Sequence, residues 1–150
     1  MNIEIKPIRF EETYPIRQLV LRPNLPKSTC FFEGDQEDAT FHFGLFETNI
    51  LVGIISLFKN NHADFPEINQ YQIRGMAVLP EYQKLGFGQK LVEYSQDYLK
   101  QKNTDLIWFN AREKAVGFYS KIGYRVFGEA FEIPTVGTHY VMYKYNVVKE

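Results

Sequence analysis

The sequence predicts a mixed α/β (α+β) protein with a mostly antiparallel central sheet flanked by helices. Its 150 residues match the length of one ordinary domain, and 45% hydrophobic residues are enough for a buried core. Strand-like patterns fill most of the first half, and two helical patterns alternate with strands in the second. Because no repeat, low-complexity tract or Ser/Gly linker divides the chain, we expect residues 1–150 to form a single domain.

The N-terminal part of the chain predicts one strand, one short helix and a loop. Residues 2–8 alternate between apolar and polar side chains, as a strand does. Thr13 can cap a helix whose first turn accommodates Pro15, and Pro23 ends that helix. Its apolar positions have helical spacing: Ile16, Leu19 and Val20. Residues 24–38 are rich in Pro, Ser, Gly and acidic residues, so they predict a loop.

The middle of the chain predicts three strands. Residues 39–47 and 50–59 are rich in β-branched and aromatic residues on either side of a short turn, which is typical of an antiparallel hairpin. After a second loop at residues 60–66, residues 71–79 predict a long third strand, which Pro80 ends.

The rest of the chain predicts two helices and three strands. Apolar residues recur at intervals of 4, 3 and 4 over residues 86–102, which predicts an amphipathic helix. Residues 106–109 form a short apolar run, typical of a central strand. Residues 115–122 have the apolar spacing of a second helix. Residues 124–127 and 140–145 predict the last two strands.

Composition excludes several classes of function. The 17 basic and 18 acidic residues balance to a net charge of −1, with a pI near 6.3, so we expect no nucleic-acid partner. The longest apolar run, residues 50–58, is too short to span a bilayer, and no secretory signal begins the chain, so we expect no membrane partner and a cytoplasmic location. Cys30 is the lone cysteine, which fits a reducing compartment, and three scattered histidines predict no metal site.

The most informative motif lies between the third strand and the first long helix. It reads Gln83-Lys-Leu-Gly86-Phe-Gly88. Glycines at a strand-to-helix turn let a ligand approach the backbone, and the first N–H groups of the helix point outward with the positive end of its dipole. This arrangement is typical of a phosphate or pyrophosphate site. A Walker A loop and a dinucleotide fingerprint are both excluded, because the first pattern is absent and Leu91 replaces the third glycine of the second.

The motif Gln-x-x-Gly-x-Gly, which follows a predicted strand, resembles the pyrophosphate loop of the GNAT family of N-acetyltransferases. Members of this family bind acetyl-coenzyme A (acetyl-CoA). A second stretch, Ala115-x-x-Phe-Tyr119-x-x-x-Gly123-Tyr, is similar to the second signature of that family. The order of predicted elements agrees with the family over essentially the full chain. The resemblance therefore implies the acyl-CoA N-acyltransferase (GNAT) fold.

The resemblance also implies which residues contact acetyl-CoA, the expected cofactor. Met76-Ala77-Val78 stands where the family's strand lies along the pantetheine arm, and Asn110 stands where the family has a cofactor-contacting asparagine. The expected contact residues are Met76, Ala77, Val78, Gln83, Lys84, Leu85, Gly86, Phe87, Gly88, Gln89, Asn110, Phe118 and Tyr119. Residues 84–121 contain seven bases and four acids, a local charge of +3 that suits a polyanionic cofactor.

The reaction that the resemblance implies is direct attack of an amine on the thioester carbonyl. Tyr119 is the candidate proton donor to the leaving thiolate, because a phenol with an ordinary pKa of about 10 is protonated at neutral pH. The alternative is that Tyr119 is only a core aromatic residue. Backbone N–H groups around Met76 and Val78 are candidates to stabilise the charge on the carbonyl oxygen. Gly75 either marks a bulge that opens the strand there or is an ordinary strand glycine.

The general base departs from the family pattern. Many members have a glutamate where this chain has Gln72, and an amide does not accept a proton. The candidate catalytic residues in its place are His139, whose ordinary pKa suits the role, and Glu132. Each has a structural alternative, a histidine at a strand end or a solvated glutamate. A water relay and capture of the minor free-amine form stay open as well.

Two residues of the third strand are candidates for binding the acceptor substrate. Arg74 can pair with a carboxylate, or it is a surface arginine of the strand. Gln72 is the other candidate. A run of acids in the first loop either attracts a cationic amine or is simply solvated: Glu33, Asp35, Glu37 and Asp38.

The sequence thus predicts an acetyl-CoA-dependent N-acetyltransferase that acetylates a small-molecule amine or an amino group. The alternative is a non-catalytic acyl-CoA-binding sensor or regulatory module on the same fold, which Gln72 favours and Tyr119 disfavours. The acceptor, the preferred acyl chain and the oligomeric state stay open, and a homodimer is compatible with the sequence.

Overall fold

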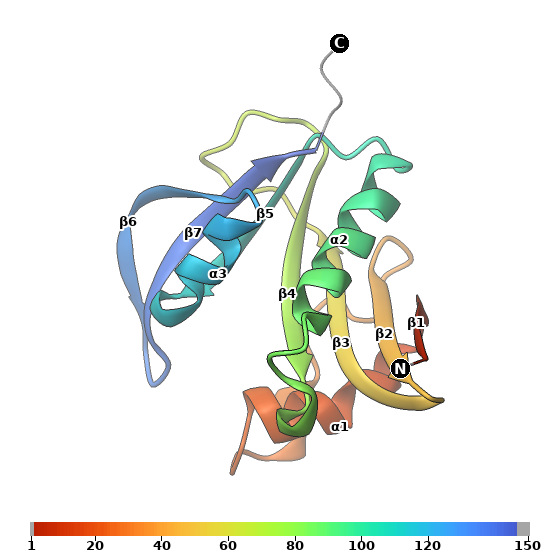
Figure 1. The fold of residues 1–150 in the computed structure, drawn as a ribbon. Helices are drawn as coiled ribbons and strands as arrows, with labels where there is room; N and C mark the ends of the chain where they lie inside the picture. Colours follow the sequence, from red (N-terminus) through yellow and green to blue (C-terminus); the bar gives the residue numbers. More distant parts are fainter. Residues whose placement is uncertain (1, 147–150) are drawn as a thin grey trace. The chain divides into compact units, whose positions relative to one another are not determined.

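The computed structural model describes residues 2–146 (Figure 1). These residues form two compact units: unit 1 comprises residues 2–59 and 73–97, and unit 2 comprises residues 60–72 and 98–146. Strand β4 (Gln70–Val78) and helix α2 (Phe87–Lys100) each contribute residues to both units. Each unit therefore combines segments that are distant in the sequence.

The predicted mixed sheet is confirmed. Strands follow the order β1-β2-β3-β4-β5-β7-β6 through the described residues. The ladders β1–β2, β2–β3, β5–β7 and β6–β7 are antiparallel, and β4–β5 is parallel. The strands other than β4 are β1 (Ile3–Pro7), β2 (Phe41–Glu47), β3 (Ile50–Lys59), β5 (Leu106–Arg112), β6 (Arg125–Ile133) and β7 (Gly137–Tyr145).

The first predicted helix is present, with Pro15 in its first α-helical turn as expected, but it is a continuous run of 3-10, α and π turns that begins at Phe10. The expectation that Thr13 caps it is wrong, because Thr13 Oγ1 donates to the carbonyl oxygen of Phe10 inside the first turn. A further helical turn lies in the predicted loop, at Lys27–Cys30. The segments other than α2 are η1 (Phe10–Thr13), α1 (Tyr14–Ile16), η2 (Arg17–Leu21), η3 (Lys27–Cys30), η4 (Pro80–Tyr82), η5 (Glu113–Ala115) and α3 (Val116–Lys121).

In unit 1 other elements pack on both faces of β3. A Cβ atom added to Gly53 would lie 3.1 Å from Cδ1 of Leu91 in α2. The next residue, Ile54, points to the other face of the strand, where it packs with Ile16 of α1 and Ala77 of β4. Burial on both faces explains the continuous apolar run of β3, which lacks the alternation of a half-exposed strand.

The turn of the β2–β3 hairpin lies where the sequence predicts it, between residues 47 and 50. Thr48 and Asn49 both have positive φ, at 44° and 69°. Two successive left-handed residues are typical of a type I′ turn, whose twist matches that of the flanking strands.

A buried polar cluster lies on the α1 side of the hairpin. The guanidinium of Arg17 is fully buried and forms a bidentate pair with Asp35, with Nη1–Oδ2 at 2.7 Å and Nη2–Oδ1 at 3.0 Å. It also donates to the carbonyl oxygen of Cys30 at 2.8 Å and to Oγ of Ser56 at 3.0 Å. His42 contacts Ser56 Oγ through Nδ1 at 2.7 Å, and burial lowers the pKa of this histidine.

This cluster corrects two expectations. Asp35 is 2% exposed, so the expectation of a solvated acidic run is wrong at this position, although Glu33, Glu37 and Asp38 are exposed. Leu19, predicted to belong to the apolar face of the first helix, is 58% exposed, and Arg17 takes the buried position instead. An arginine can be buried there because Asp35 neutralises its charge.

Replacing Asp35 with asparagine should lower the free energy of unfolding by about 3 kcal/mol, because the charge of Arg17 then stays buried without a counter-charge. Urea unfolding measures the change. Glu37→Gln, at an exposed acid of the same loop, is the control and should shift stability by less than about 0.5 kcal/mol. Parent-like stability of Asp35→Asn would show that the ion pair does not hold this loop.

In unit 2 the sheet of β5, β6, β7 and the first residues of β4 also has two different faces. One face is an aromatic and aliphatic core: Phe65, Leu106, Trp108 and Val141, with Phe127, Phe131 and Tyr143 packed against it. On the other face Phe109 packs against Tyr119 of α3 and against Tyr124, with ring centroids 4.3 and 5.0 Å apart. Trp108 and Phe109 face opposite ways because successive strand residues alternate.

The last two strands are longer than the sequence predicts. Residues 124–127 and 140–145 were expected as strands, whereas β6 and β7 continue to a turn at residues 134–136. Gly128, with φ +74°, lies where the register shifts between Phe127 and Phe131. Such an irregularity lets β6 continue past Gly128. A glycine in a strand pattern usually indicates the end of the strand, so the sequence predicted an end at residue 127.

No helix among residues 2–146 is long and apolar enough to cross a membrane. The same residues contain no group of three or more His, Cys, Asp or Glu side chains arranged to hold a metal ion.

Candidate functional site

The turn between β4 and α2 has an unusual backbone. It runs from the end of η4 through Gln83, Lys84, Leu85 and Gly86 to the first residue of α2. Lys84 has φ +65° and Gly86 has φ +84°. A lysine in the left-handed region costs about 1 kcal/mol or more, so the turn holds its shape against local strain.

Two side chains fix this turn to unit 1. Gln83 Nε2 donates a hydrogen bond to the carbonyl oxygen of Val78, the last residue of β4, at 2.9 Å. Phe87 is 3% exposed and its ring stacks on Tyr82 with centroids 6.5 Å apart. The first residue of the motif and the first residue of the helix are therefore both anchored, and the residues between them are exposed.

The first turn of α2 presents free N–H groups to solvent. The carbonyl of Gly86 accepts from the N–H of Lys90 at 3.1 Å, which makes Gly86 the residue that caps the helix. The N–H groups of Phe87, Gly88 and Gln89 have no intrahelical acceptor, as in every α-helix. A Cβ added to Gly86 would have no atom within 4 Å, so the space over this turn is open. Helix α2 has 14 residues, enough for a substantial dipole.

Together these features fit an anionic phosphate group. The donors are backbone N–H groups, which need no side-chain rearrangement, and Lys84 and Lys90 are exposed beside them. The residues present thus fit the pyrophosphate of a nucleotide-like cofactor without any metal.

Strand β4 has a bulge-like residue just before the expected pantetheine segment. Gly75 has φ +66° in the middle of the strand. A Cβ there would lie 3.0 Å from Phe32 and 3.4 Å from Nε of Arg17. Ala77 is buried in the core of unit 1, whereas Met76 and Val78 are partly exposed. The left-handed glycine agrees with a local irregularity in the strand rather than with an ordinary strand glycine.

In unit 2, Tyr119 is buried in an aromatic cluster. It is 9% exposed, and besides Phe109 its ring contacts Phe118 and Tyr124, with centroids 5.0 and 6.2 Å away. Burial raises the pKa of Tyr119 to about 12. The phenol therefore keeps its proton throughout the neutral range. Phe118 itself is 38% exposed.

The candidate base His139 lies in β7 and is 4% exposed. Its Nδ1 lies 2.8 Å from the carbonyl oxygen of Gly137. A carbonyl only accepts, so Nδ1 holds the proton of the neutral ring and Nε2 keeps a lone pair. The ring contacts Phe131, which packs on the Trp108 face of the sheet.

The structure does not bring His139 and Tyr119 to the same face of unit 2, since Tyr119 packs on Phe109. Glu132 is exposed, and its Oε1 accepts a hydrogen bond from Thr138 at 2.5 Å. Asn110, in β5 opposite Val141, is exposed as a ligand-contacting residue needs to be.

The two candidate substrate-binding residues have different surroundings. Gln72 is 8% exposed and its Oε1 accepts from Asn60 Nδ2 at 2.9 Å, so its amide is already engaged within unit 2. Arg74, in unit 1, is half-buried against the rings of Phe32 and Phe58. It is thus not the plain surface arginine that was one reading of the sequence.

Sequence reasoning missed the cluster in which Arg17, Arg22 and Arg74 lie around the ring of Phe32. No local signal marks Arg17 for burial, because its partner Asp35 is 18 residues away in the sequence.

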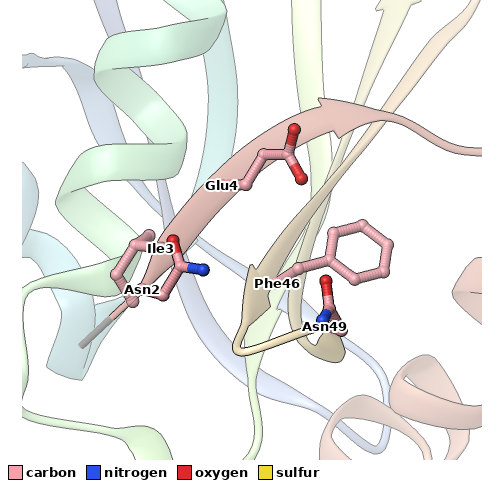
Figure 2. Close-up of a pocket in the computed structure, with 5 residues that line it drawn as sticks. All are labelled: Asn2, Ile3, Glu4, Phe46 and Asn49. Atoms are coloured by element: carbon pink, nitrogen blue, oxygen red, sulfur yellow. The ribbon is translucent and has the colours of Figure 1, made fainter.

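A surface hollow in unit 1 lies elsewhere, beside β1 and the β2–β3 turn (Figure 2). It is lined by Asn2, Ile3, Glu4, Phe46 and Asn49, none of which was predicted to act in a site. A second hollow, in unit 2, includes Arg112 and Thr138, which lie next to Glu132 or His139 in the β-ladders.

Comparison with known proteins gives a consistent result. The model of the acetyltransferase (GNAT) family matches residues 5–124. The chain is 35% identical over 142 residues to the uncharacterized N-acetyltransferase YitI of Bacillus subtilis (strain 168), covering 95% of each protein. It is 29% identical over 123 residues to the [ribosomal protein bS18]-alanine N-acetyltransferase of Haemophilus influenzae, covering 81% of this chain and 78% of that protein.

A crystal structure of an aminoglycoside 6′-N-acetyltransferase complexed with coenzyme A has the same fold. Its TM-score is 0.77 at 15% identity, and the match covers 100% of this chain and 99% of that one.

Proposed function

The chain belongs to the acetyltransferase (GNAT) family, and from that premise we propose that it transfers the acetyl group of acetyl-CoA to the amine of a small molecule or amino group by direct attack. The family consists of acetyl-CoA-dependent N-acetyltransferases, so the chain is an enzyme of that class. The nature of the acceptor and the roles of individual residues are the proposal.

The observation that supports the proposal most is the open N-terminus of α2. Its free N–H groups, with Gly86 in a left-handed conformation and no atom within 4 Å of an added Cβ, would hold the cofactor pyrophosphate. Gln83 to Gln89 supply this contact, and Met76 and Val78, partly exposed on β4, would lie along the pantetheine arm. Bound acetyl-CoA supplies an activated thioester.

The reaction then has three requirements. Backbone N–H groups near Met76 and Val78 would stabilise the charge that develops on the carbonyl oxygen. Tyr119, protonated up to about pH 12, would give its proton to the leaving thiolate. The acceptor must lose a proton before attack, and we assign this step to water or to the minor free-amine form, because His139 lies on the opposite face of the sheet from Tyr119.

Acetylation of a panel of amines, amino acids and short peptides, followed by release of free CoA, tests the function. We expect turnover with at least one class of acceptor and none with buffer alone. Tight cofactor binding without turnover across the panel would contradict the proposal and favour an acyl-CoA sensor.

Two variants test the candidate bases. His139→Ala and Glu132→Gln should both keep the acid limb of the pH profile of kcat/KM, because His139 lies on the opposite face of the sheet from Tyr119 and Glu132 is exposed and engaged with Thr138. Loss of the acid limb in one variant alone would identify that residue as the base and contradict the assignment to water or the free amine.

A further inference from the structure

A cluster of three arginines surrounds one phenylalanine in unit 1. The guanidinium carbon atoms of Arg17, Arg74 and Arg22 lie 3.9, 4.6 and 5.6 Å from the centroid of the Phe32 ring. Phe32 is 6% exposed, so the three cations gather around a nearly buried aromatic ring. Stacking on an aromatic ring holds the plane of a guanidinium group and leaves its edge free for hydrogen bonds.

The positive charge of this cluster is only partly neutralised. The buried carboxylate among these residues, Asp35, is committed to Arg17 through two hydrogen bonds. Burial, followed by the charges of Arg17 and Arg22, lowers the pKa of Arg74, as expected for cations held close together. Two carboxylates face the three cations, the buried Asp35 and the exposed Glu33, which acts on Arg74. The cations still outnumber the carboxylates, and an oxyanion would balance the remaining charge.

One donor of the cluster is unsatisfied. Arg17 is fully buried, and its Nε has no hydrogen-bond partner among the described residues. Arg22 donates to the neighbouring carbonyl oxygen of Leu21, at 3.2 Å, through Nη1. No ion pair is found for Arg74 or Arg22 within residues 2–146. The guanidinium groups of Arg74 and Arg22 therefore have donors that are not committed to a carboxylate, and Arg17 contributes positive charge beside them.

The cluster lies close to the expected reaction centre along the strand. Arg74 precedes Met76 by two residues on β4, about 7 Å along a strand, with the left-handed Gly75 between them. An acceptor whose amine reaches the thioester near Met76 would place a second group near Arg74 if it had the size of an amino acid.

We propose that the arginine cluster binds an oxyanion of the acceptor, so that the preferred substrate has both an amine and a carboxylate or phosphate. Arg74 and Arg22 donate to the oxyanion, and Phe32 holds the guanidinium groups in place. This inference rests on the proposed function, because it concerns the acceptor of that reaction. It narrows the acceptor from amines in general to acidic amines.

Matched pairs of acceptors test the inference. Amino acids are compared with their amides, and phosphoethanolamine with ethanolamine, by kcat/KM from CoA release. We expect the acidic member of at least one pair to react at least about 10-fold better, the value of one charge-assisted hydrogen bond. The carboxylate and phosphate pairs distinguish the two oxyanions. The amine of an amide is less basic than that of its amino acid, so a larger share of it is unprotonated at neutral pH. The supply of free amine therefore favours the amide, opposite to the preference that we expect.

Variants then tie the preference to the cluster. Arg74→Gln and Arg22→Gln should each abolish the preference, by lowering kcat/KM for the acidic acceptor to that for its neutral partner, while the Kd for coenzyme A stays unchanged. Arg9→Gln is the control, since the side chain of Arg9 is 78% exposed in unit 1. Arg22→Gln serves independently if Arg74→Gln fails to fold, which urea unfolding shows.

Each outcome is decisive. Equal rates within every pair, or a preference that survives in both glutamine variants, overturn the inference and leave the transferase function standing. Turnover of neutral amines without turnover of their acidic partners also overturns the inference and leaves the transferase function standing. If coenzyme A binds but no amine is acetylated, both the inference and the proposed function are overturned. If coenzyme A does not bind, the assignment of the cofactor is wrong, and with it the function and the inference that rest on it.

Discussion

Gly86→Val is expected to weaken coenzyme A binding by at least about 100-fold, or roughly 3 kcal/mol. The φ of +84° is unfavourable for a β-branched residue, and the added side chain would fill the open space over the first N–H groups of α2. Calorimetric titration with coenzyme A measures the loss. Because no protein atom lies within 4 Å of the added Cβ, the substitution meets no steric obstacle inside the fold.

Gly128→Val is the matched control for this experiment. Gly128 also has positive φ, at +74°, and no atom within 4 Å of an added Cβ, but it lies in β6. Both variants should lose a similar amount of stability, about 1–2 kcal/mol, from backbone strain. Only Gly86→Val should lose the cofactor. Equal losses of affinity in the two variants would mean that strain alone, and not the turn, determines binding.

Tyr119→Phe is expected to lower kcat by about 100-fold or more, with little change in the KM for acetyl-CoA, because it removes a proton donor that acts in the transition state. The phenylalanine ring keeps the contacts with Phe109, so the fold should be retained. Tyr124→Phe, in the same aromatic cluster, is the control and should keep the kcat of the parent protein. A parent-like kcat in Tyr119→Phe would remove this hydroxyl from the chemistry.

The raised pKa of Tyr119 adds a signature in the pH dependence of stability. The folded state holds this proton up to about pH 12, whereas the unfolded chain releases it near pH 10. The folded state therefore binds more protons in that interval, and stability decreases as the pH rises from about 10 to 12. Tyr119→Phe should lessen that decline. The same pKa predicts no alkaline loss of kcat near pH 10.

Local features of the chain could be predicted because they depend on near neighbours. The turn at Thr48 and Asn49 has the left-handed residues that a two-residue hairpin loop requires. Asn103 and Gly123, just after the two predicted helices, also have positive φ, at 58° and 101°, as residues that end helices often do. Gly86, in the turn between β4 and α2, has the left-handed conformation that glycine adopts most easily.

Features that depend on distant partners could not be predicted in the same way. Arg17 and Asp35 are 18 residues apart in the sequence, and each alone reads as a surface charge. Their burial is favourable only when the fold places the guanidinium group of Arg17 against the carboxylate of Asp35. The arginine cluster around Phe32 was missed for this reason.

The separation of His139 from Tyr119 was hidden for a related reason. A side chain in a strand faces one side or the other according to register, and one residue of slippage reverses it. The sequence pattern ended the sixth strand at residue 127, before the irregularity at Gly128 that carries it to Ile133. With β6 predicted to end at residue 127, the sequence could not predict that His139 pairs with Arg112 and Phe131.

The most direct test of the account follows the backbone amides of Phe87, Gly88 and Gln89 in proton–nitrogen NMR spectra during titration with coenzyme A and, separately, with pantetheine. Pantetheine lacks the pyrophosphate. If the first turn of α2 grips that group, these amides shift strongly with coenzyme A and hardly at all with pantetheine. Shifts of equal size with both ligands, or none with coenzyme A at saturation, would contradict the assignment of this turn as the cofactor site.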